Sequence, residues 1–132
     1  MRVLFVCVEN SNRSQMAEAF ARRLGGPGIE AWSAGSKPSG RVNPKAIEAM
    51  REKGCDLTKH ASKSLAELPA AEFDAAVTMG CGDACPHVRA NVREDWSIPD
   101  PRDMSPEEFR GVRDLIEAQV QGLLARLAAV ER

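Results

Sequence analysis

The chain lacks three features that would each point to a class of protein: a long apolar run, an excess of charge of one sign, and tyrosine. Its longest apolar run, Val3 to Val8, falls far short of the ~20 residues that cross a bilayer, and is too short and badly flanked for a secretory signal. The 18 basic and 19 acidic residues form no long block of either sign, so composition does not indicate a nucleic-acid partner. We therefore expect a cytoplasmic protein that binds neither nucleic acid nor membrane.

The 132 residues, 43% of them hydrophobic, predict a single domain over 1–132 that can build a core without disulfide or metal support. The four cysteines, Cys7, Cys55, Cys81 and Cys85, therefore need another explanation. In a reducing compartment, cysteines are more often catalytic, redox-active or metal-binding than structural.

Buried-strand patterns alternate with helical patterns along the chain. Strands are predicted at 2–6, 29–33 and 73–79 and near Trp96, and helices around 16–24, from Pro44 to Gly54, and from Pro106 to Val130. This order predicts an α/β fold, a three-layer sandwich around a small four-stranded, mostly parallel sheet with flavodoxin-like topology. Ligands of such sheets bind beyond the carboxyl ends of the strands, which here are the loops after Val6 and Met79, where most of the cysteines lie.

The segment from Cys7 to Ser14 joins a predicted buried strand to a helix. Loop N–H groups beside a helix start can cradle a tetrahedral oxyanion, and an arginine can grip two of its oxygens. The same positive field favours a thiolate, so Cys7 is a candidate nucleophile. The plainer alternative is that Cys7 ends a strand and Arg13 lies on the surface. The candidate oxyanion-binding residues are Val8, Glu9, Asn10, Ser11, Asn12, Arg13 and Ser14.

The motif of a cysteine followed after five residues by Arg-Ser resembles the phosphate loop of the low-molecular-weight protein tyrosine phosphatases and of the arsenate reductases built on that fold. The resemblance to the arsenate reductase branch continues in register over nearly the whole chain. It includes the stretches Arg13–Glu18, Trp32–Gly35, Val42–Met50, His60–Ser62, Val77–Met79, Cys85–Pro86, Trp96 and Asp100–Pro101.

The resemblance implies an arsenate reductase in which Cys7 forms an arsenic adduct and Arg13 and the loop amides hold the oxyanion. Cys81 would then attack the Cys7 sulfur, arsenite would leave, and Cys85 would attack Cys81. Asp100 matches the family's general acid, although a turn or capping role is its plainer reading. No cofactor is expected to be bound. The reductant is thioredoxin, a glutaredoxin- or mycoredoxin-like protein, or a small thiol such as glutathione, mycothiol or bacillithiol, and the chain is expected to be a monomer.

The spacing of Cys81 and Cys85 restricts the last step. Residues four apart on a helix hold their β-carbons about 5–6 Å apart, whereas a disulfide needs roughly 3.5–4.5 Å. Since Gly80 and Gly82 flank Cys81, we predict a redox loop that bends or unwinds.

Three positions depart from the family pattern. Family loops usually carry glycine where Glu9 stands, and we expect the Glu9 carboxylate to point outward, because an acid would weaken oxyanion binding. Many relatives have a cysteine at the position of Asn12. Some relatives bind potassium with residues matching Asn10, Glu18, Ser33 and an acid at position 63. Here that position is Lys63, whose ammonium can take the place of the cation, so no bound metal is predicted.

Two alternatives remain. A low-molecular-weight phosphatase would hydrolyse phosphate monoesters through a Cys7 phosphocysteine. Such enzymes typically follow their Asp-Pro with aromatic residues, whereas Asp100-Pro101 is followed by Arg102-Asp103 and the chain has no tyrosine. A non-enzymatic redox or zinc-binding module would use Cys81, Cys85 and His87, with or without Cys55. We otherwise expect a buried packing role for Cys55, a local hydrogen-bonding role for His60 and an exposed position for His87.

Overall fold

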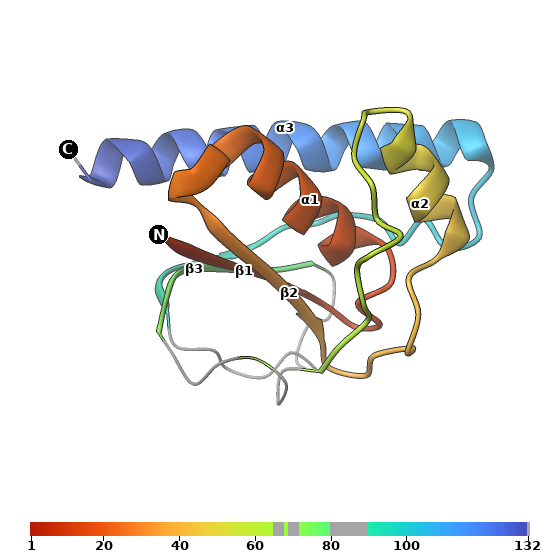
Figure 1. Ribbon diagram of the computed structural model, residues 1–132, viewed down its shortest axis with the longest axis horizontal. Helices are drawn as coiled ribbons and strands as arrows, with labels where there is room; N and C mark the ends of the chain where they lie inside the picture. The colour runs from red at the N-terminus through yellow and green to blue at the C-terminus, as the bar shows by residue number, and fades with distance from the viewer. Residues whose placement is uncertain (65–67, 69–71, 80–89, 132) are drawn as a thin grey trace.

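A four-stranded parallel sheet forms the centre of the molecule (Figure 1). The computed structural model describes residues 1–64, 68, 72–79 and 90–131, and the side chains up to 129. Strands β1 (Arg2–Cys7), β2 (Glu30–Gly35), β3 (Phe73–Thr78) and β4 (Ala90–Asp95) lie in the order β2-β1-β3-β4. Every pair is parallel, so the predicted mostly parallel sheet is wholly parallel among the described residues.

Three helices lie on one side of this sheet: α1 (Arg13–Gly25), α2 (Pro44–Arg51) and α3 (Pro106–Glu131) (Figure 1). The two proline-led starts form as the sequence predicts. Asn43 caps α2 by accepting a hydrogen bond from the Lys45 amide. Ser105 and Glu108 cap α3 reciprocally, since each side chain accepts from the backbone N–H of the other.

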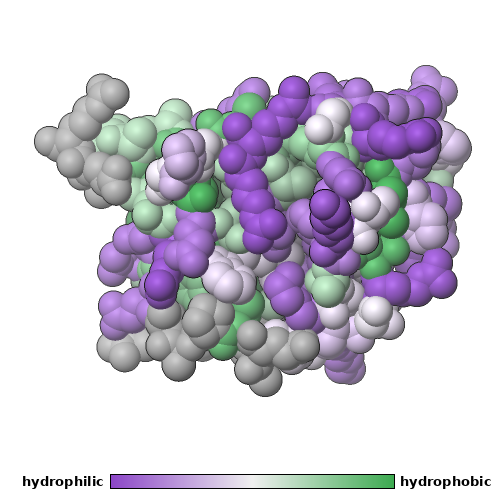
Figure 2. All heavy atoms as spheres, in the orientation of Figure 1, coloured by the Kyte–Doolittle hydropathy of each residue, from purple (hydrophilic) through white to green (hydrophobic). Residues whose placement is uncertain are grey.

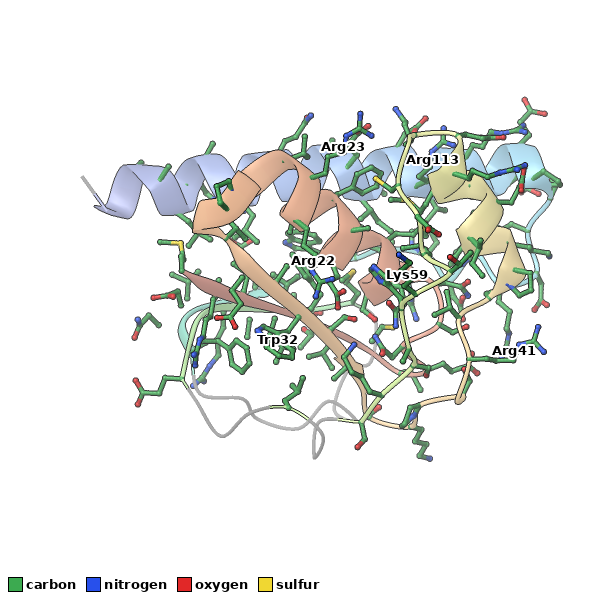
Figure 3. The ribbon with its side chains drawn as sticks, in the orientation of Figure 1. Arg22, Arg23, Trp32, Arg41, Lys59 and Arg113 are labelled. Carbon is green, nitrogen blue, oxygen red and sulfur yellow. The ribbon has the colours of Figure 1, made fainter. Side chains whose placement is uncertain are left out.

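The apolar run of β1 fills both faces of the sheet. Val3, Phe5 and Cys7 pack into the larger core with the helices, whereas Leu4 and Val6 belong to a smaller cluster on the opposite face. Trp32 packs on that second cluster and points away from the helices (Figure 3). No described helix covers the second face, and 65–67, 69–71 and 80–89 lie outside the described residues, so a helical layer there remains a prediction.

The fourth strand lies next to Trp96, as expected, but does not include it. The strand predicted near Trp96 ends at Asp95, and Trp96 begins the segment that leaves the sheet. The Trp96 amide still donates to the carbonyl of Thr78, and its ring lies 5.9 Å from that of Phe5. Trp96 therefore packs under the sheet's carboxyl end instead of extending β4, and it directs the following residues toward the loop after β1.

The surface of the helical side is polar. Figure 2 shows hydrophilic side chains gathered over α2 and the neighbouring part of α3. Ion pairs join these two helices: Glu52 accepts from Arg110 and from Arg113, which lies between α2 and α3 (Figure 3). Within the described chain, no helix is both long and apolar enough to cross a bilayer.

Candidate active site

The loop between β1 and α1 is a tight turn at the carboxyl edge of the sheet. Cys7 is the last residue of β1 and Arg13 the first of α1. Asn10 takes a positive φ of 50°, a conformation that asparagine tolerates better than most residues. The end of β2 lies so close that a β-carbon on Gly35 would meet the Val8 carbonyl oxygen at 2.6 Å. Gly35 therefore allows the loop to fold back over the sheet.

Hydrogen bonds link Cys7, Ser14 and Asn10 beneath the cavity. The Cys7 Sγ lies 2.9 Å from Ser14 Oγ, and Asn10 Nδ2 donates to the same hydroxyl oxygen at 2.8 Å. Either the Cys7 thiol or the Ser14 hydroxyl can be the donor of this contact, and a Cys7 thiolate would accept from the hydroxyl. The described geometry therefore suits a nucleophilic cysteine.

A second set of polar residues holds the loop from below. Gln15 Nε2 donates to the backbone and side-chain oxygens of Asn10 and to the Ala61 carbonyl. Gln15 Oε1 then accepts from Nδ1 of His60 at 2.9 Å, which assigns the ring hydrogen to that nitrogen. Burial lowers the pKa of His60, so the neutral ring is favoured. His60 therefore forms a hydrogen bond, as expected, but to a residue 45 positions away instead of a local one.

The loop faces a cavity of about 510 Å³ with room for a small tetrahedral anion. Its second wall comes from the segment that follows Trp96, and Arg13 Nη1 fastens the two walls together by donating to the Ile98 carbonyl at 3.0 Å. The lining residues are Cys7, Val8, Glu9, Ser11, Asn12, Arg13, Ile98, Asp100 and Arg102. Of the predicted oxyanion-binding residues, Asn10 and Ser14 do not line the cavity, because they are fully buried beneath it.

Asp100 lies on the wall that faces Cys7, as its predicted role as a general acid requires. It is exposed, and its Oδ1 accepts the Arg102 amide in a short turn. The carboxyl group therefore serves the turn and also borders the cavity, and its role as a general acid stays a prediction.

Glu9 departs from its expectation in part. The carboxylate is 37% exposed, as an outward-pointing acid should be, but it pairs with Arg102 at 2.9 Å and lines the cavity. The charge of Glu9 is therefore balanced by a residue that the sequence did not assign to the site.

Glu18 is the centre of a buried charge cluster behind the loop. Its side chain is 3% exposed and accepts from Ser33 Oγ at 2.7 Å. Lys63 Nζ lies 3.6 Å from it and His60 Nδ1 3.4 Å, and Arg22 pairs with it while reaching from α1 toward β2 (Figure 3). The Lys63 ammonium thus occupies a place beside Glu18, in keeping with the expectation that it substitutes for a cation.

The remaining cysteines divide in two. Cys81 and Cys85, together with His87, lie outside the described residues. Cys55 is buried, as predicted, and lines a separate cavity of about 420 Å³ with Arg51 and Asp56. Across the described ranges, no three His, Cys, Asp or Glu side chains are grouped so that they could hold a metal ion.

Several supporting residues were not found from the sequence. Gln15 and Gly35 shape the loop, whereas Ile98 and Arg102 complete the cavity. Of these residues, only Arg102 could have been anticipated from the sequence, because an acid in an oxyanion loop needs a cationic partner. The sequence does not say which of the 18 basic residues supplies that partner.

A thiol at the end of a central parallel strand, facing an anion-sized cavity beside the arginine that starts the next helix, defines a phosphate-loop protein of the flavodoxin-like α/β class. The chain belongs to the low molecular weight phosphotyrosine protein phosphatase family, whose profile matches residues 2–132.

Similar proteins include several arsenate reductases. The chain is 39% identical over 130 residues to a glutaredoxin arsenate reductase of Synechocystis sp., covering 96% of this chain and 98% of that protein. It is 40% identical over 123 residues to an arsenate reductase of Staphylococcus aureus, covering 90% and 92%. A solved arsenate reductase in the phosphate-binding state superposes with a TM-score of 0.87 at 39% identity, covering 95% of this chain and 97% of that one.

Proposed function

We propose that this protein reduces arsenate to arsenite, with Cys7 as the nucleophile. The observation that carries the proposal is the Cys7 sulfur, hydrogen-bonded to Ser14 and placed in an anion-sized cavity, in a chain about 40% identical to arsenate reductases. Arsenate and phosphate have the same shape and charge, so a relative in a phosphate-binding state supports an oxyanion site here.

The first step forms the arsenic adduct. Arg13 and the loop amides hold the oxyanion above Cys7, and the thiolate forms a sulfur–arsenic bond. One arsenate oxygen departs as water, with Asp100 placed to supply a proton. No electrons have yet moved to arsenic, so this step alone would equally begin a phosphatase reaction on a phosphate ester.

The second step carries the reduction. The Cys81 thiolate attacks the Cys7 sulfur, a disulfide forms, and the sulfur–arsenic bond breaks with its electron pair left on arsenic, which departs as arsenite. Cys85 then attacks Cys81 and releases the Cys7 thiolate. The protein is left with a Cys81–Cys85 disulfide, and an external thiol must return two electrons before the next turnover.

The external reductant is proposed to be a small thiol–disulfide protein. A solved Corynebacterium glutamicum arsenate reductase, 28% identical with a TM-score of 0.79, is thioredoxin-dependent, and the Synechocystis relative is a glutaredoxin arsenate reductase. The Corynebacterium match covers 98% of this chain and 62% of the other. Both couplings would serve the same Cys81–Cys85 disulfide.

The test supplies the reduced protein with arsenate and with either thioredoxin and its reductase or a glutaredoxin system with glutathione, and measures arsenite. We expect catalytic arsenite formation with at least one donor. Cys7→Ser should abolish it, whereas Cys55→Ala should retain it, because Cys55 is packed beside a different cavity. Failure with both donors, together with brisk hydrolysis of an aryl phosphate, would instead identify a phosphatase.

A further inference from the structure

Glu9 places a carboxylate in the loop that is proposed to bind an anion. A negative charge at that position repels a negatively charged ligand, and the repulsion falls only slowly with distance in a partly desolvated cavity. A basic residue from a remote part of the chain forms an ion pair with this carboxylate. Glu9 Oε1 lies 2.9 Å from Nη1 of Arg102, a residue 93 positions further along.

Both partners are held in place by their own backbones. The Glu9 carbonyl accepts from the Ser39 amide and from Ser62 Oγ. The Arg102 amide donates to Asp100, and its carbonyl accepts from Lys45 Nζ at 3.0 Å. Only the two side chains are therefore free to rearrange, and the backbones keep their charged ends within reach of each other.

The Glu9–Arg102 pair lies at the rim of the cavity. Glu9 belongs to the loop wall and Arg102 to the facing wall, and both line the same cavity as Cys7. Cys7 is 3% exposed, whereas the Glu9 and Arg102 side chains are 37% and 54% exposed. The exposed fraction of the side chains thus rises from the Cys7 sulfur toward the rim. The Glu9–Arg102 pair joins the two walls of the cavity above the sulfur.

We propose that Arg102 is a second anion-binding side chain of this site, which Glu9 holds at the rim until an oxyanion takes it over. An exposed carboxylate pair is weak, so it does not trap the guanidinium. The donors that grip a carboxylate also fit two oxygens of a tetrahedral oxyanion, which carries more charge than Glu9 does. Glu9 therefore keeps Arg102 in position and lowers the affinity at the same time.

The inference rests on the proposed function only in requiring an oxyanion above Cys7, and it can be tested without reduction. The probe is inorganic phosphate, which should slow alkylation of Cys7 by iodoacetamide in the fully reduced protein. Peptide mass analysis separates Cys7 from the other cysteines. The quantity compared is the phosphate concentration that gives half-maximal protection, because it does not depend on the intrinsic reactivity of each variant.

We expect Arg102→Ala to raise this concentration about tenfold, since one positive charge is lost and Glu9 is left unpaired. Glu9→Gln should lower it several-fold, because Arg102 is freed and the repulsion is removed. The double variant should lie between them, and Arg102→Ala should cost no less without Glu9, because the oxyanion then competes with no carboxylate for the guanidinium. Arg102→Lys, which keeps the charge but loses the planar group, should fall between wild type and Arg102→Ala.

The Glu48–Arg51 pair supplies the matched control. It is an exposed pair on α2, at 2.6 Å, and neither residue lines this cavity. Arg51→Ala changes the net charge as Arg102→Ala does and should leave protection unchanged. The inference alone would be overturned if phosphate protects wild type but Arg102→Ala changes the half-maximal concentration less than twofold. The same holds if Arg102→Ala changes it no more than Arg51→Ala does. No protection in wild type would overturn the oxyanion site and this inference together.

Discussion

At the scale of single residues, Ser14 is the clearest example of how the surroundings prepare Cys7. Its hydroxyl accepts from Asn10 and lies 2.9 Å from the sulfur, where it can donate to a thiolate. Hydrogen bonds to charged groups contribute about 1.5–3 kcal/mol, so the contact with the reacting sulfur is large enough to affect the rate at which Cys7 reacts.

Ser14→Ala should therefore slow the alkylation of Cys7 by iodoacetamide at neutral pH about tenfold or more. The control is Ser36→Ala, because Ser36 Oγ is buried and has no hydrogen-bond partner within the described part of the chain. Equal rates for wild type and Ser14→Ala would mean that the serine packs beside Cys7 without activating it.

Gly35 is a second residue whose effect can be isolated. A methyl group there would meet the backbone of Val8 at 2.6 Å and that of Asn10 at 3.0 Å, so the loop would have to shift. Gly35→Ala should weaken phosphate protection of Cys7 at least tenfold, because displaced loop amides no longer point at the oxyanion.

Gly111→Ala provides the matching glycine control. A β-carbon there meets open space in α3, so the change should stabilise the protein by about 0.8–1 kcal/mol and leave phosphate protection as in wild type. Equal protection in Gly35→Ala would show that the loop tolerates displacement.

At the scale of helices and strands, local sequence patterns predict most of the elements. Pro44 and Pro106 each begin a helix, as predicted, and in the structure each follows a residue whose side chain caps that helix. The sequence predicts a strand near Trp96, as found, but not whether Trp96 belongs to it, because an aromatic residue suits a strand or a core equally well. Trp96 packs against Phe5, a contact between residues so far apart in the chain that local pattern cannot decide it.

The contact between α2 and α3 gives a pH-dependent prediction. Hydrogen bonds from Arg110 and then Arg113 lower the pKa of Glu52 to about 2. In the unfolded chain this pKa is about 4.3, so the folded state binds fewer protons between the two values. The stabilisation from ionised Glu52 is therefore complete above pH ~4.3 and is lost as the pH falls toward about 2.

Glu52→Gln should consequently lower the free energy of unfolding most at neutral pH. Denaturant titrations of wild type and variant at several pH values between 6 and 3 should give a difference that shrinks below pH ~4.3. A difference that stays constant over this range would contradict the assignment of the ion pairs to Glu52.

At the scale of the whole molecule, topology assembles the site. The parallel sheet places the carboxyl ends of β1 and β4 at one edge, so Cys7 and the segment carrying Asp100 form facing walls. This much follows from the mostly parallel sheet that the sequence predicts. The pairing of Glu9 with Arg102 does not follow, because it depends on how two loops 93 residues apart happen to meet.

The central claim is that the protein itself carries the two electrons that convert arsenate to arsenite. The most direct measurement is a single turnover: fully reduced protein, freed of external thiol, is mixed with excess arsenate, and arsenite and free thiols are both counted. The account predicts about one arsenite per chain and the loss of two of the four thiols, with a Cys81–Cys85 disulfide in the peptide map. No arsenite with all four thiols retained would contradict it.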